Sequence, residues 1–457
     1  MTQSAPLPAI AFYARDFLAD EFSRLGAALT GEAGERPRFY IVSKRAEAEQ
    51  VQANDPVGRV FVLGDYLAAA EAMEPVRDER FHALAKLVRR DRYVARMDLP
   101  KIATILQGIK LLEDALAEAG PIALLLDEPV SGIVNDALDR FVTAQGGLGA
   151  HFNVGWVPGH IWFARGAMQD RPIALDLLDD GPAKVAAHIA QRKRDAGLPA
   201  YLHNYRGVLR PLKAAAKYGA MGMRRRMVKA ETFLDADPWP HDFMASSLAA
   251  SITAKYDDPK DIAASGAKCV IYPLHYEPEA VISYWSSFTN QLALAMEAFE
   301  HLPADTYLLL KEHPSQPGAL QQDKWQDLLA NARVKRIHGT VKMADLLAGP
   351  SALVSIGSTA VLETVMHGRP AFVVGQPHFR SMPGVTPVDD WNNFAVDWDA
   401  QGQDSGSGEE ALQSWYGDFL NRHCVEGQFM RGRTDIPRAG EMIDRLLQVA
   451  AEEGAAS

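Results

Sequence analysis

The sequence predicts an α/β protein made of two Rossmann-like domains that face each other across a cleft. The chain has 457 residues, which is too long for one compact core. Apolar runs of strand length alternate with amphipathic helical patterns, and this alternation stops once and then starts again. Such alternation is typical of βαβ units around a parallel sheet. We predict domains over residues 1–256 and 267–435, followed by a C-terminal helix over 436–457.

In the first half, buried strands and amphipathic helices lead to an acidic turn. Strands are predicted at Ile10–Tyr13, Phe39–Val42, Val60–Leu63 and Ile122–Leu126, and helices at Phe17–Ala28, Arg80–Val88 and Ile102–Ala117. The last strand ends in Asp127-Glu128-Pro129. Residues 257–266 contain Pro259 and Gly266 and are predicted to be a linker.

In the second half, the alternation is clearer. Strands are predicted at Cys269–Leu274, Tyr307–Lys311, Val334–Ile337, Ala352–Ile356 and Ala371–Val374, and helices at Ser286–Phe299, Asp323–Leu329, Met343–Leu347 and Ala360–Met366. Gly368 is predicted to end the last of these helices in a left-handed conformation. We expect an exposed loop over 401–410 and a terminal helix over 438–451.

The composition is that of a soluble enzyme, with 47% hydrophobic and 23% charged residues. No apolar run approaches the roughly 20 residues of a membrane span, and residues 1–15 lack the pattern of a secretory signal. The two cysteines, Cys269 and Cys424, are far apart and fit a reduced compartment. A net charge of −11 argues against nucleic-acid binding. We therefore predict a cytoplasmic protein.

The charge is unevenly distributed, because the stretch from Arg206 to Lys229 is basic and contains no acid. One interpretation is the solvated face of a helix. The other is a patch that meets anionic lipid headgroups or a pyrophosphate-linked acceptor, which would place the protein at the inner face of the membrane.

Candidate binding residues lie where the strands of the second domain end, the edge at which such sheets bind ligands. Lys311 ends a strand and is followed by Glu312, His313 and Pro314. The proline makes the chain turn and holds His313 at the strand tip. Its imidazole can donate to a phosphate oxygen, and a protonated ring adds charge. The alternative is a histidine that satisfies a local carbonyl.

A small-residue turn with Ser358 and Thr359 leads into the next helix, which carries Glu363. Free backbone N–H groups and hydroxyls at such a turn can meet an anion, and Glu363 can accept from ribose hydroxyls. Alternatively, a hydroxyl caps the helix and Glu363 is a surface acid. Gln376 follows the next strand and offers a donor and an acceptor to a base or sugar. His275 follows the first strand of this domain as a candidate wall of the cleft.

Asp127 and Glu128 are the catalytic candidates of the first domain. They follow a buried strand and should reach the cleft. Glycosyl transfer needs a base for the acceptor hydroxyl, and a double displacement also needs a carboxylate nucleophile. The alternative is a turn or helix-cap role. We interpret the triplets Asp235-Ala236-Asp237 and Asp397-Trp398-Asp399 as turn acids, so no metal site is predicted.

These motifs, in their order over residues 268–380, resemble the bacterial capsule-synthesis glycosyltransferases, a group with the GT-B arrangement that includes β-Kdo transferases using CMP-Kdo. The His313-Pro314 pair also resembles that of transferases using CMP-sialic acid. The resemblance implies that His313, Ser358 and Thr359 contact phosphate and that Glu363 and Gln376 lie near the nucleoside. A CMP-linked donor needs no metal, so no cofactor is implied.

The leading hypothesis is therefore transfer of a sugar, Kdo from CMP-Kdo, to a bacterial surface polysaccharide or glycolipid. The partners would be a nucleotide sugar and a glycan or lipid-linked acceptor. Two alternatives stay open: an alditol-phosphate transferase that uses a CDP-linked donor, and a non-catalytic subunit of a polysaccharide assembly complex.

Overall fold

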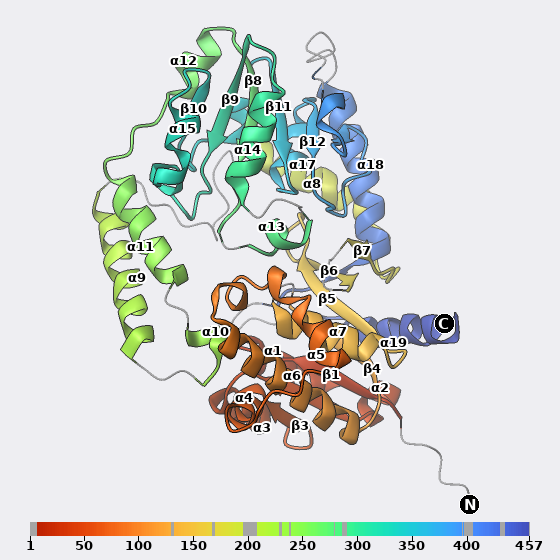
Figure 1. The fold of residues 1–457 in the computed structure, drawn as a ribbon. Coiled ribbons are helices and arrows are strands. Elements are labelled where there is room, and N and C mark those ends of the chain that lie inside the picture. Colours follow the sequence, from red (N-terminus) through yellow and green to blue (C-terminus); the bar gives the residue numbers. More distant parts are fainter. Residues whose placement is uncertain are drawn as a thin grey trace, which may run out of the picture. The chain divides into compact units, whose positions relative to one another are not determined.

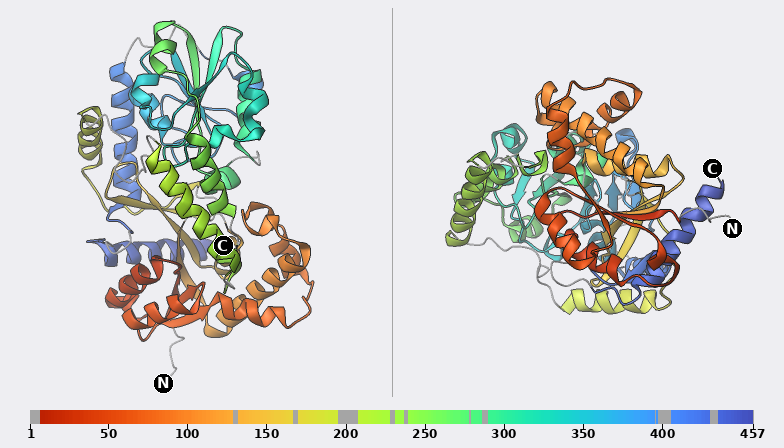
Figure 2. Two further views of the ribbon diagram at one scale, coloured as in Figure 1. Left: turned by 90° about the vertical axis from the view of Figure 1, so that its left-hand side faces the viewer. Right: turned by 90° about the horizontal axis from the view of Figure 1, so that it is seen from below.

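The chain folds into two compact α/β units in a computed structural model, shown in Figures 1 and 2. The structure describes residues 7–128, 132–166, 170–194, 208–227, 231–236, 239–277, 279–285, 290–394, 396, 405–429 and 435–456. Unit 1 comprises residues 1–179, 229–236 and 420–457, and unit 2 comprises residues 180–228 and 237–419.

Unit 1 is built on one mixed sheet with a parallel centre. Its strands are β1 (Ala9–Tyr13), β2 (Arg38–Val42), β3 (Arg59–Val62), β4 (Ile122–Asp127), β5 (Leu148–Val154), β6 (His160–Arg165), β7 (Arg171–Pro172) and β14 (Cys424–Glu426). The order is β14-β6-β5-β4-β1-β2-β3, with β7 beside β6. The five strands β3, β2, β1, β4 and β5 are parallel, whereas β6 and β14 are antiparallel to their neighbours.

Helices cover both faces of this sheet. They are α1 (Leu18–Ala28), α2 (Gly31–Glu35), α3 (Arg45–Asn54), α4 (Leu63–Glu71), α5 (Glu79–Ala85), η1 (Val88–Arg90), η2 (Val94–Arg96), α6 (Leu99–Ala119), α7 (Ile133–Thr143), α10 (Phe233–Ala236) and α19 (Ala439–Ala456). Residues of α1, α2, α3 and α19 pack on one face, and residues of α4 to α7 pack on the other. Successive residues of β1 point to opposite faces and are all buried, which is why the strand is a continuous apolar run.

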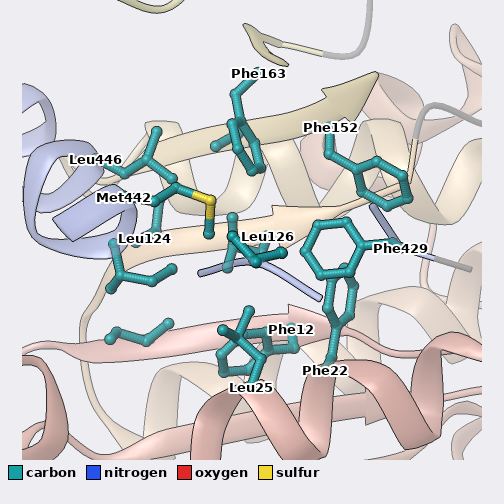
Figure 3. Close-up of a cluster of buried hydrophobic side chains, with 14 of the residues drawn as sticks. Phe12, Phe22, Leu25, Leu124, Leu126, Phe152, Phe163, Phe429, Met442 and Leu446 are labelled. Atoms are coloured by element: carbon teal, nitrogen blue, oxygen red, sulfur yellow. The ribbon is translucent and has the colours of Figure 1, made fainter. Parts of the chain in front are cut away.

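The end of the chain completes the core of unit 1. Phe429 packs edge-on against Phe22 of α1, with ring centroids 5.2 Å apart, and also contacts Phe152 of β5. Met442 and Leu446 of α19 lie in the same cluster, beside the strand residues of β4 (Figure 3). A segment more than 400 positions along the chain is therefore part of the first sheet's hydrophobic core.

Unit 2 contains a six-stranded sheet that is parallel throughout. Its strands are β8 (Lys268–Pro273), β9 (Thr306–Lys311), β10 (Val334–Ile337), β11 (Ser351–Ser355), β12 (Ala371–Val373) and β13 (Val385–Pro387). The order β10-β9-β8-β11-β12-β13 is that of a Rossmann sheet. Its connection direction reverses between β8 and β11.

The helices of unit 2 come from both of its chain segments. They are α8 (Gly181–Arg194), α9 (Leu209–Met227), α11 (Trp239–Ser251), α12 (Pro259–Ala264), α13 (Ala280–Trp285), α14 (Gln291–Glu300), η3 (Ala319–Gln321), η4 (Asp323–Trp325), α15 (Gln326–Leu329), α16 (Met343–Leu346), α17 (Ala360–Met366) and η5 (Trp391–Asn393). α18 (Ser405–His423) begins in unit 2 and ends in unit 1. The pair of Rossmann-like sheets that the sequence predicts is confirmed, and the cleft between them stays a prediction.

The compact units differ from the domain limits drawn from the sequence. Residues 180–228 and 237–256, which the sequence places in the first domain, belong to unit 2, and residues 420–435 belong to unit 1 with the C-terminal helix. The reason is that α9 packs on α11 and α11 in turn contacts η3 of unit 2, whereas the apolar face of α19 packs on β4 and β5. These crossings depend on contacts between distant segments, which no local pattern reveals.

Two segments predicted as loops contain helices, which corrects both predictions. The expected linker over 257–266 holds α12, in which Pro259 occupies the first turn and the Asp258 side chain accepts from the Lys260 N–H. In the expected loop over 401–410, α18 already begins at Ser405. The predicted helix Ser286–Phe299 corresponds to α14, which starts later, and α13 precedes it. Several residues named in the sequence predictions lie outside the described residues: Pro129, Arg206, Lys229, Asp237, 286–289, 397–399 and 401–404.

Candidate functional site

Strands are added to the sheet of unit 2 in one direction from β8 to β10 and in the other direction from β11 to β13. The carboxyl ends of β8 and β11 therefore lie at the point where the strand order reverses. His275 follows β8, and Ser355 is the last residue of β11. Ligands of open α/β sheets bind outside the carboxyl ends of the strands at such a switch point. The candidate donor site of unit 2 is therefore built around these two residues.

Two buried glutamines fix the loop that follows β8. The Gln291 amide oxygen accepts the backbone N–H of His275 at 2.5 Å, and its amide nitrogen donates to the carbonyl of the same residue at 3.0 Å. Gln316 makes the equivalent pair of bonds to the backbone of Glu277, at 2.9 and 2.7 Å. Each side chain thus satisfies one buried N–H and one buried C=O. The sequence reasoning missed both glutamines because no local pattern marks them.

A hydrogen-bonded chain links this loop to the turn after β11. Nδ1 of His275 lies 3.0 Å from the Glu279 carboxylate, and Nε2 lies 3.4 Å from Oγ of Ser355. A carboxylate only accepts, so Nδ1 carries the proton and Nε2 accepts from the serine hydroxyl. Oγ of Ser355 in turn accepts the N–H of Gly357 at 3.3 Å and of Ser358 at 3.0 Å. Because Ser355 is fully buried, this chain holds the turn in place and does not form a nucleophile for an external substrate.

His313 is half-buried beside this chain. Its Nδ1 accepts the N–H of Ser315 at 3.2 Å, so the neutral ring carries its proton on Nε2. Burial lowers the pKa of His313 to about 4, and the nearby Lys311 ammonium acts in the same direction against the opposing charge of Glu279. The ring is therefore a neutral Nε2–H donor near pH 7. This differs from the expectation that a protonated imidazole adds charge.

Lys311 and Glu312 are both buried and serve the loops around His313. The Lys311 ammonium donates to the Gly339 carbonyl at 2.7 Å, and burial lowers its pKa to about 8. The Glu312 carboxylate accepts the N–H groups of Gly318 and Leu320 at 2.9 and 3.0 Å. In the described structure Lys311 therefore binds the protein backbone, whereas the sequence predicts that it contacts the nucleotide sugar. Pro314 lies in the turn directly after His313, as predicted.

The turn after β11 has the small residues that the sequence analysis singled out. Oγ of Ser358 accepts the N–H of Ala360 at 3.2 Å, and Thr359 is exposed and makes no side-chain cap bond. Glu363 of α17 forms an ion pair with Arg192 of α8, and each side chain is 21% exposed. A ribose contact by Glu363 would therefore share this carboxylate with Arg192, a partner that the sequence reasoning missed. Gly368 has φ 64°, which confirms the predicted left-handed end of α17.

An indole ring packs against the backbone at two neighbouring strand ends. A Cβ on Gly357 would lie 2.7 Å from the Trp285 ring. A Cβ on Gly375 would lie 3.0 Å from Cβ of Trp285 and 2.3 Å from the Ile356 carbonyl oxygen. Both positions therefore need glycine. Gln376 comes next and is exposed, as a recognition residue requires.

A small cavity lies next to His275 and His313. It measures about 10 Å³, and its lining also includes Phe243, Gln291 and Lys324. Ligand pockets usually measure about 300–1,000 Å³. This cavity has room for no more than a water molecule, so it does not define the nucleotide-sugar site.

The sheet of unit 1 also has a switch point, between β1 and β4. Arg15 follows β1, and Asp127 and Glu128 end β4 and begin its loop. The guanidinium of Arg15 lies 3.2 Å from the Glu128 carboxylate, whose side chain is 29% exposed. Asp16 has φ 51°, an uncommon backbone conformation for a residue other than glycine. Glu128 is thus an accessible acid at the edge where ligands of such sheets bind.

Asp127, by contrast, is fully buried. Its carboxylate accepts the Glu128 N–H at 2.6 Å and the Asn135 amide at 2.7 Å, and it lies 3.6 Å from Nδ1 of His151. Burial raises the pKa of Asp127 to about 7, against the opposing effects of His151, Asn135 and Arg15. Asp127 therefore positions the turn and does not reach an open surface, which corrects the sequence prediction that it reaches the cleft.

His151 of β5 joins this buried network. Nε2 lies 3.3 Å from the Asp139 carboxylate. Burial lowers the pKa of His151, but the hydrogen bond to Asp139 and the charge of Asp127 raise it overall. The pairing of β4 with β5 places Asp127 opposite His151. The sequence reasoning missed this contact because the two residues are 24 positions apart.

Among the described residues, no group of three or more His, Cys, Asp or Glu side chains is arranged to hold a metal ion. The described helices also include none with the length and apolar character needed to cross a membrane.

Comparison with known protein families gives a match in unit 2. Residues 249–406 match the family described as capsule polysaccharide biosynthesis protein. This stretch contains all the predicted donor-site residues, from His275 to Gln376. The match confirms, for this stretch of the chain, the resemblance that the motifs indicate.

Curated relatives match over a shorter stretch. The capsule polysaccharide modification protein LipB of Neisseria meningitidis, from a serogroup A and a serogroup B strain, is 32% identical over 107 residues. The match covers 22% of this chain and only 24% of each relative's length.

Solved structures with similarity to the chain include a transferase and a putative epimerase. A β-Kdo 2,7 transferase, KpsC of Thermosulfurimonas dismutans, is 14% identical, with a TM-score of 0.35, and the match covers 75% of this chain and 89% of that one. A putative UDP-N-acetylglucosamine 2-epimerase of Listeria monocytogenes is 13% identical, with a TM-score of 0.25. This match covers 98% of this chain and 96% of the epimerase chain. The fold assignment depends instead on the strand orders of the two sheets themselves.

Proposed function

We propose that this protein is a glycosyltransferase that moves Kdo from CMP-Kdo onto a bacterial surface polysaccharide or glycolipid. One observation carries the proposal. His275, His313 and the Ser355–Thr359 turn converge at the carboxyl ends of β8, β9 and β11, within the segment that matches the capsule polysaccharide family. The sheet order makes this edge the expected ligand site.

In the proposed donor site, unit 2 binds the nucleotide end of the sugar. His313 donates its Nε2–H to a phosphate oxygen, and Ser358 and Thr359 contribute hydroxyl contacts. His275 keeps the turn in position through Ser355. The exposed amide of Gln376 can donate to and accept from the cytosine ring, and Glu363 can accept from ribose. The proposed site uses no metal, because these side chains alone hold a nucleotide sugar that has a single phosphate.

In the proposed transfer step, Glu128 of unit 1 accepts the proton of the acceptor hydroxyl. The acceptor oxygen forms a bond to the anomeric carbon, and the bond between that carbon and the phosphate oxygen breaks. The electron pair of the broken bond leaves with CMP, and its charge is stabilised by the Nε2–H donor of His313. Arg15 orients the Glu128 carboxylate through their ion pair.

The donor assignment can be tested by calorimetry with CMP, CDP and UDP. We expect the protein to bind CMP, and His313→Ala to weaken binding about 10- to 150-fold, because a hydrogen bond to a charged group contributes roughly 1.5–3 kcal/mol. His82→Ala, at an exposed histidine of unit 1, is the control and should bind like the wild type. Unchanged affinity in His313→Ala would remove this residue from the site.

The catalytic assignment can be tested with Glu128→Gln, which keeps the shape of the side chain. We expect it to retain CMP binding and to lose transfer by about 10²–10⁴-fold, the usual contribution of a general base. Glu118→Gln changes an exposed acid of the same unit and should remain active. Full activity of Glu128→Gln would place the base elsewhere.

The same assays separate the two alternatives. Transfer from CDP-glycerol with none from CMP-Kdo would identify an alditol-phosphate transferase. Nucleotide binding without turnover of either donor would identify a non-catalytic subunit. The burial of Asp127 is what favours this second alternative, because it leaves Glu128 as the exposed acid of the Asp127-Glu128 pair.

A further inference from the structure

The helix α9 presents three different faces along its length. It has 19 residues, and of these only Pro211 and Gly222 are buried. Its packing partner is α11, which lies beside it (Figure 1). A helix with so little buried surface has most of its circumference available for contact with something else.

The face toward α11 is made of small and aromatic residues. A Cβ on Gly222 would lie 2.4 Å from the Asp242 carboxylate of α11, so glycine permits the close approach of the two helices. The rings of Tyr218 and His241 lie 6.0 Å apart, and Arg226 forms an ion pair with Asp242. The residues of this face are the ones that pack α9 against α11.

A second face is apolar and exposed. Its residues follow one another at helical spacing of three or four: Leu209, Leu212, Ala216, Ala220, Met223 and Met227. Leu209 is 70% exposed and Met227 is 78% exposed. Large apolar side chains scattered singly on a surface are ordinary, but a continuous stripe of this kind marks an interaction surface.

A third face, directly beside the apolar stripe, is basic. Arg210, Lys213, Lys217 and Arg224 recur at intervals that place them on one side of the helix, and all four are exposed. The stretch 206–229 contains no acidic residue, although the whole chain has a net charge of −11. This helix therefore carries six basic side chains and no acidic one.

From these faces we infer that α9 lies in the surface of an anionic lipid bilayer. The apolar stripe enters the boundary between headgroups and acyl chains, and the lysine and arginine heads beside it pair with lipid phosphates. An apolar stripe with a basic flank is the combination by which a helix binds in the interface of a negatively charged membrane. The helix lies on the membrane and does not cross it.

This inference does not depend on the proposed glycosyl transfer, because binding would occur with or without turnover. The two are connected only in that a lipid-linked acceptor would be found at the same surface. A flotation assay with vesicles measures the lipid contact, and the transfer assay measures the chemistry, so either one can fail alone.

The test is flotation of the full chain with vesicles of phosphatidylcholine alone and of phosphatidylcholine mixed with phosphatidylglycerol. We expect binding to the mixed vesicles only, and weaker binding at high salt. The triple variant Lys213→Glu, Lys217→Glu, Arg224→Glu should bind at least on the order of 100-fold more weakly, given about 1 kcal/mol per basic residue near such a surface. The variant Leu212→Gln, Met223→Gln should lose binding while keeping the basic flank.

The matched control is Lys255→Glu, Lys260→Glu, Lys342→Glu, which makes the same charge change at exposed lysines of the same unit. It should float like the wild type, and circular dichroism should show that all variants keep their helices. Equal binding to neutral and mixed vesicles, or unchanged binding of the Leu212/Met223 variant, would overturn the inference. Self-association of the wild type without vesicle binding, abolished in that variant, would assign the stripe to a second copy of the chain instead.

Discussion

Two carboxylates that are neighbours in the chain, Asp127 and Glu128, have opposite environments. Asp127 is buried and accepts hydrogen bonds from Asn135 and from the next residue's N–H, whereas Glu128 is partly exposed and pairs with Arg15. At the end of a strand, successive side chains point to opposite sides of the sheet. The strand geometry therefore divides the two acids into one that fixes the turn and one that can meet a substrate.

The buried state of His313 predicts how the protein responds to acid. Its pKa is about 4 in the folded protein and about 6.5 when unfolded, so the unfolded state binds a proton more readily between these values. Stability is therefore lost as pH falls from about 6.5 toward 4. In His313→Gln we expect this loss to be smaller by up to roughly 3 kcal/mol, as measured by urea unfolding at both pH values.

The control for this prediction is His82→Gln, which removes an exposed histidine. It should leave the pH dependence of the unfolding free energy as in the wild type. His188, whose pKa burial also lowers to about 4, is present in every variant and cancels in the comparison. An identical acid response in His313→Gln and the wild type would contradict the burial of the ring.

At the scale of elements, the donor site is made of loops whose backbone is hydrogen-bonded by side chains from other segments. Gln291 begins α14 and Gln316 precedes η3, yet both hold the backbone of the loop after β8. The loop after β10 is held in a similar way, because Lys311 at the end of β9 donates to the Gly339 carbonyl. Neighbouring strand ends thus hydrogen-bond to one another's loops.

Gly339 offers a test of this close packing. A Cβ at this position would lie 2.8 Å from the carbonyl carbon and oxygen of His313, both of which are backbone atoms that cannot rotate away. Gly339→Ala should therefore lower the unfolding free energy by about 1–3 kcal/mol, the usual cost of overpacking, and should weaken CMP binding by displacing His313. Thermal unfolding and calorimetry would measure the two effects.

Gly349 in the same unit is the matched control, since a Cβ there would meet nothing within 4 Å. Gly349→Ala should be neutral or slightly stabilising, because alanine reduces the entropy of the unfolded chain. Equal stability of the two alanine variants would mean that the loops after β9 and β10 can move apart at little cost.

At the scale of the whole molecule, the chain passes between the units more than once. Residues 180–228 leave unit 1 to join unit 2, and residues 420–457 return to complete the core of unit 1. Neither unit is therefore a continuous stretch of sequence, and α19 is part of the first sheet's packing. Removal of the C-terminal residues would expose apolar side chains of β4 and β5.

Leu446 of α19 tests this arrangement, because its side chain is fully buried in the core shown in Figure 3. Leu446→Ala should cost about 2–5 kcal/mol, the usual range for a buried leucine. Hydrogen exchange should become faster in peptides of β4, β5 and α1 and stay unchanged in peptides of β8 to β13. Asp444→Ala, at an exposed position of the same helix, should change neither. Faster exchange confined to unit 2 would show that α19 does not stabilise the first sheet.

The sequence by itself determined most strands and the chemistry at their ends. β1, β4 and β9 were predictable because a strand buried on both faces is a continuous apolar run between turn residues. The same pattern located His313 and the turn at Ser358, because a residue that directly follows a parallel strand must lie at the carboxyl edge of the sheet.

Only the tertiary structure decided which of these residues are exposed and what holds them. Asp127 and Lys311 are buried by contacts between distant parts of the chain. Glu363 pairs with Arg192, and Gln291 and Gln316 bond to the loop after β8, so these contacts join residues 16 to 171 positions apart. The apolar stripe of α9 was hidden in the sequence for the same reason, since periodicity shows that a helix has an apolar face but not whether a partner covers it. Burial and pairing are properties of space, and spacing along the chain reports only the positions that one element brings together.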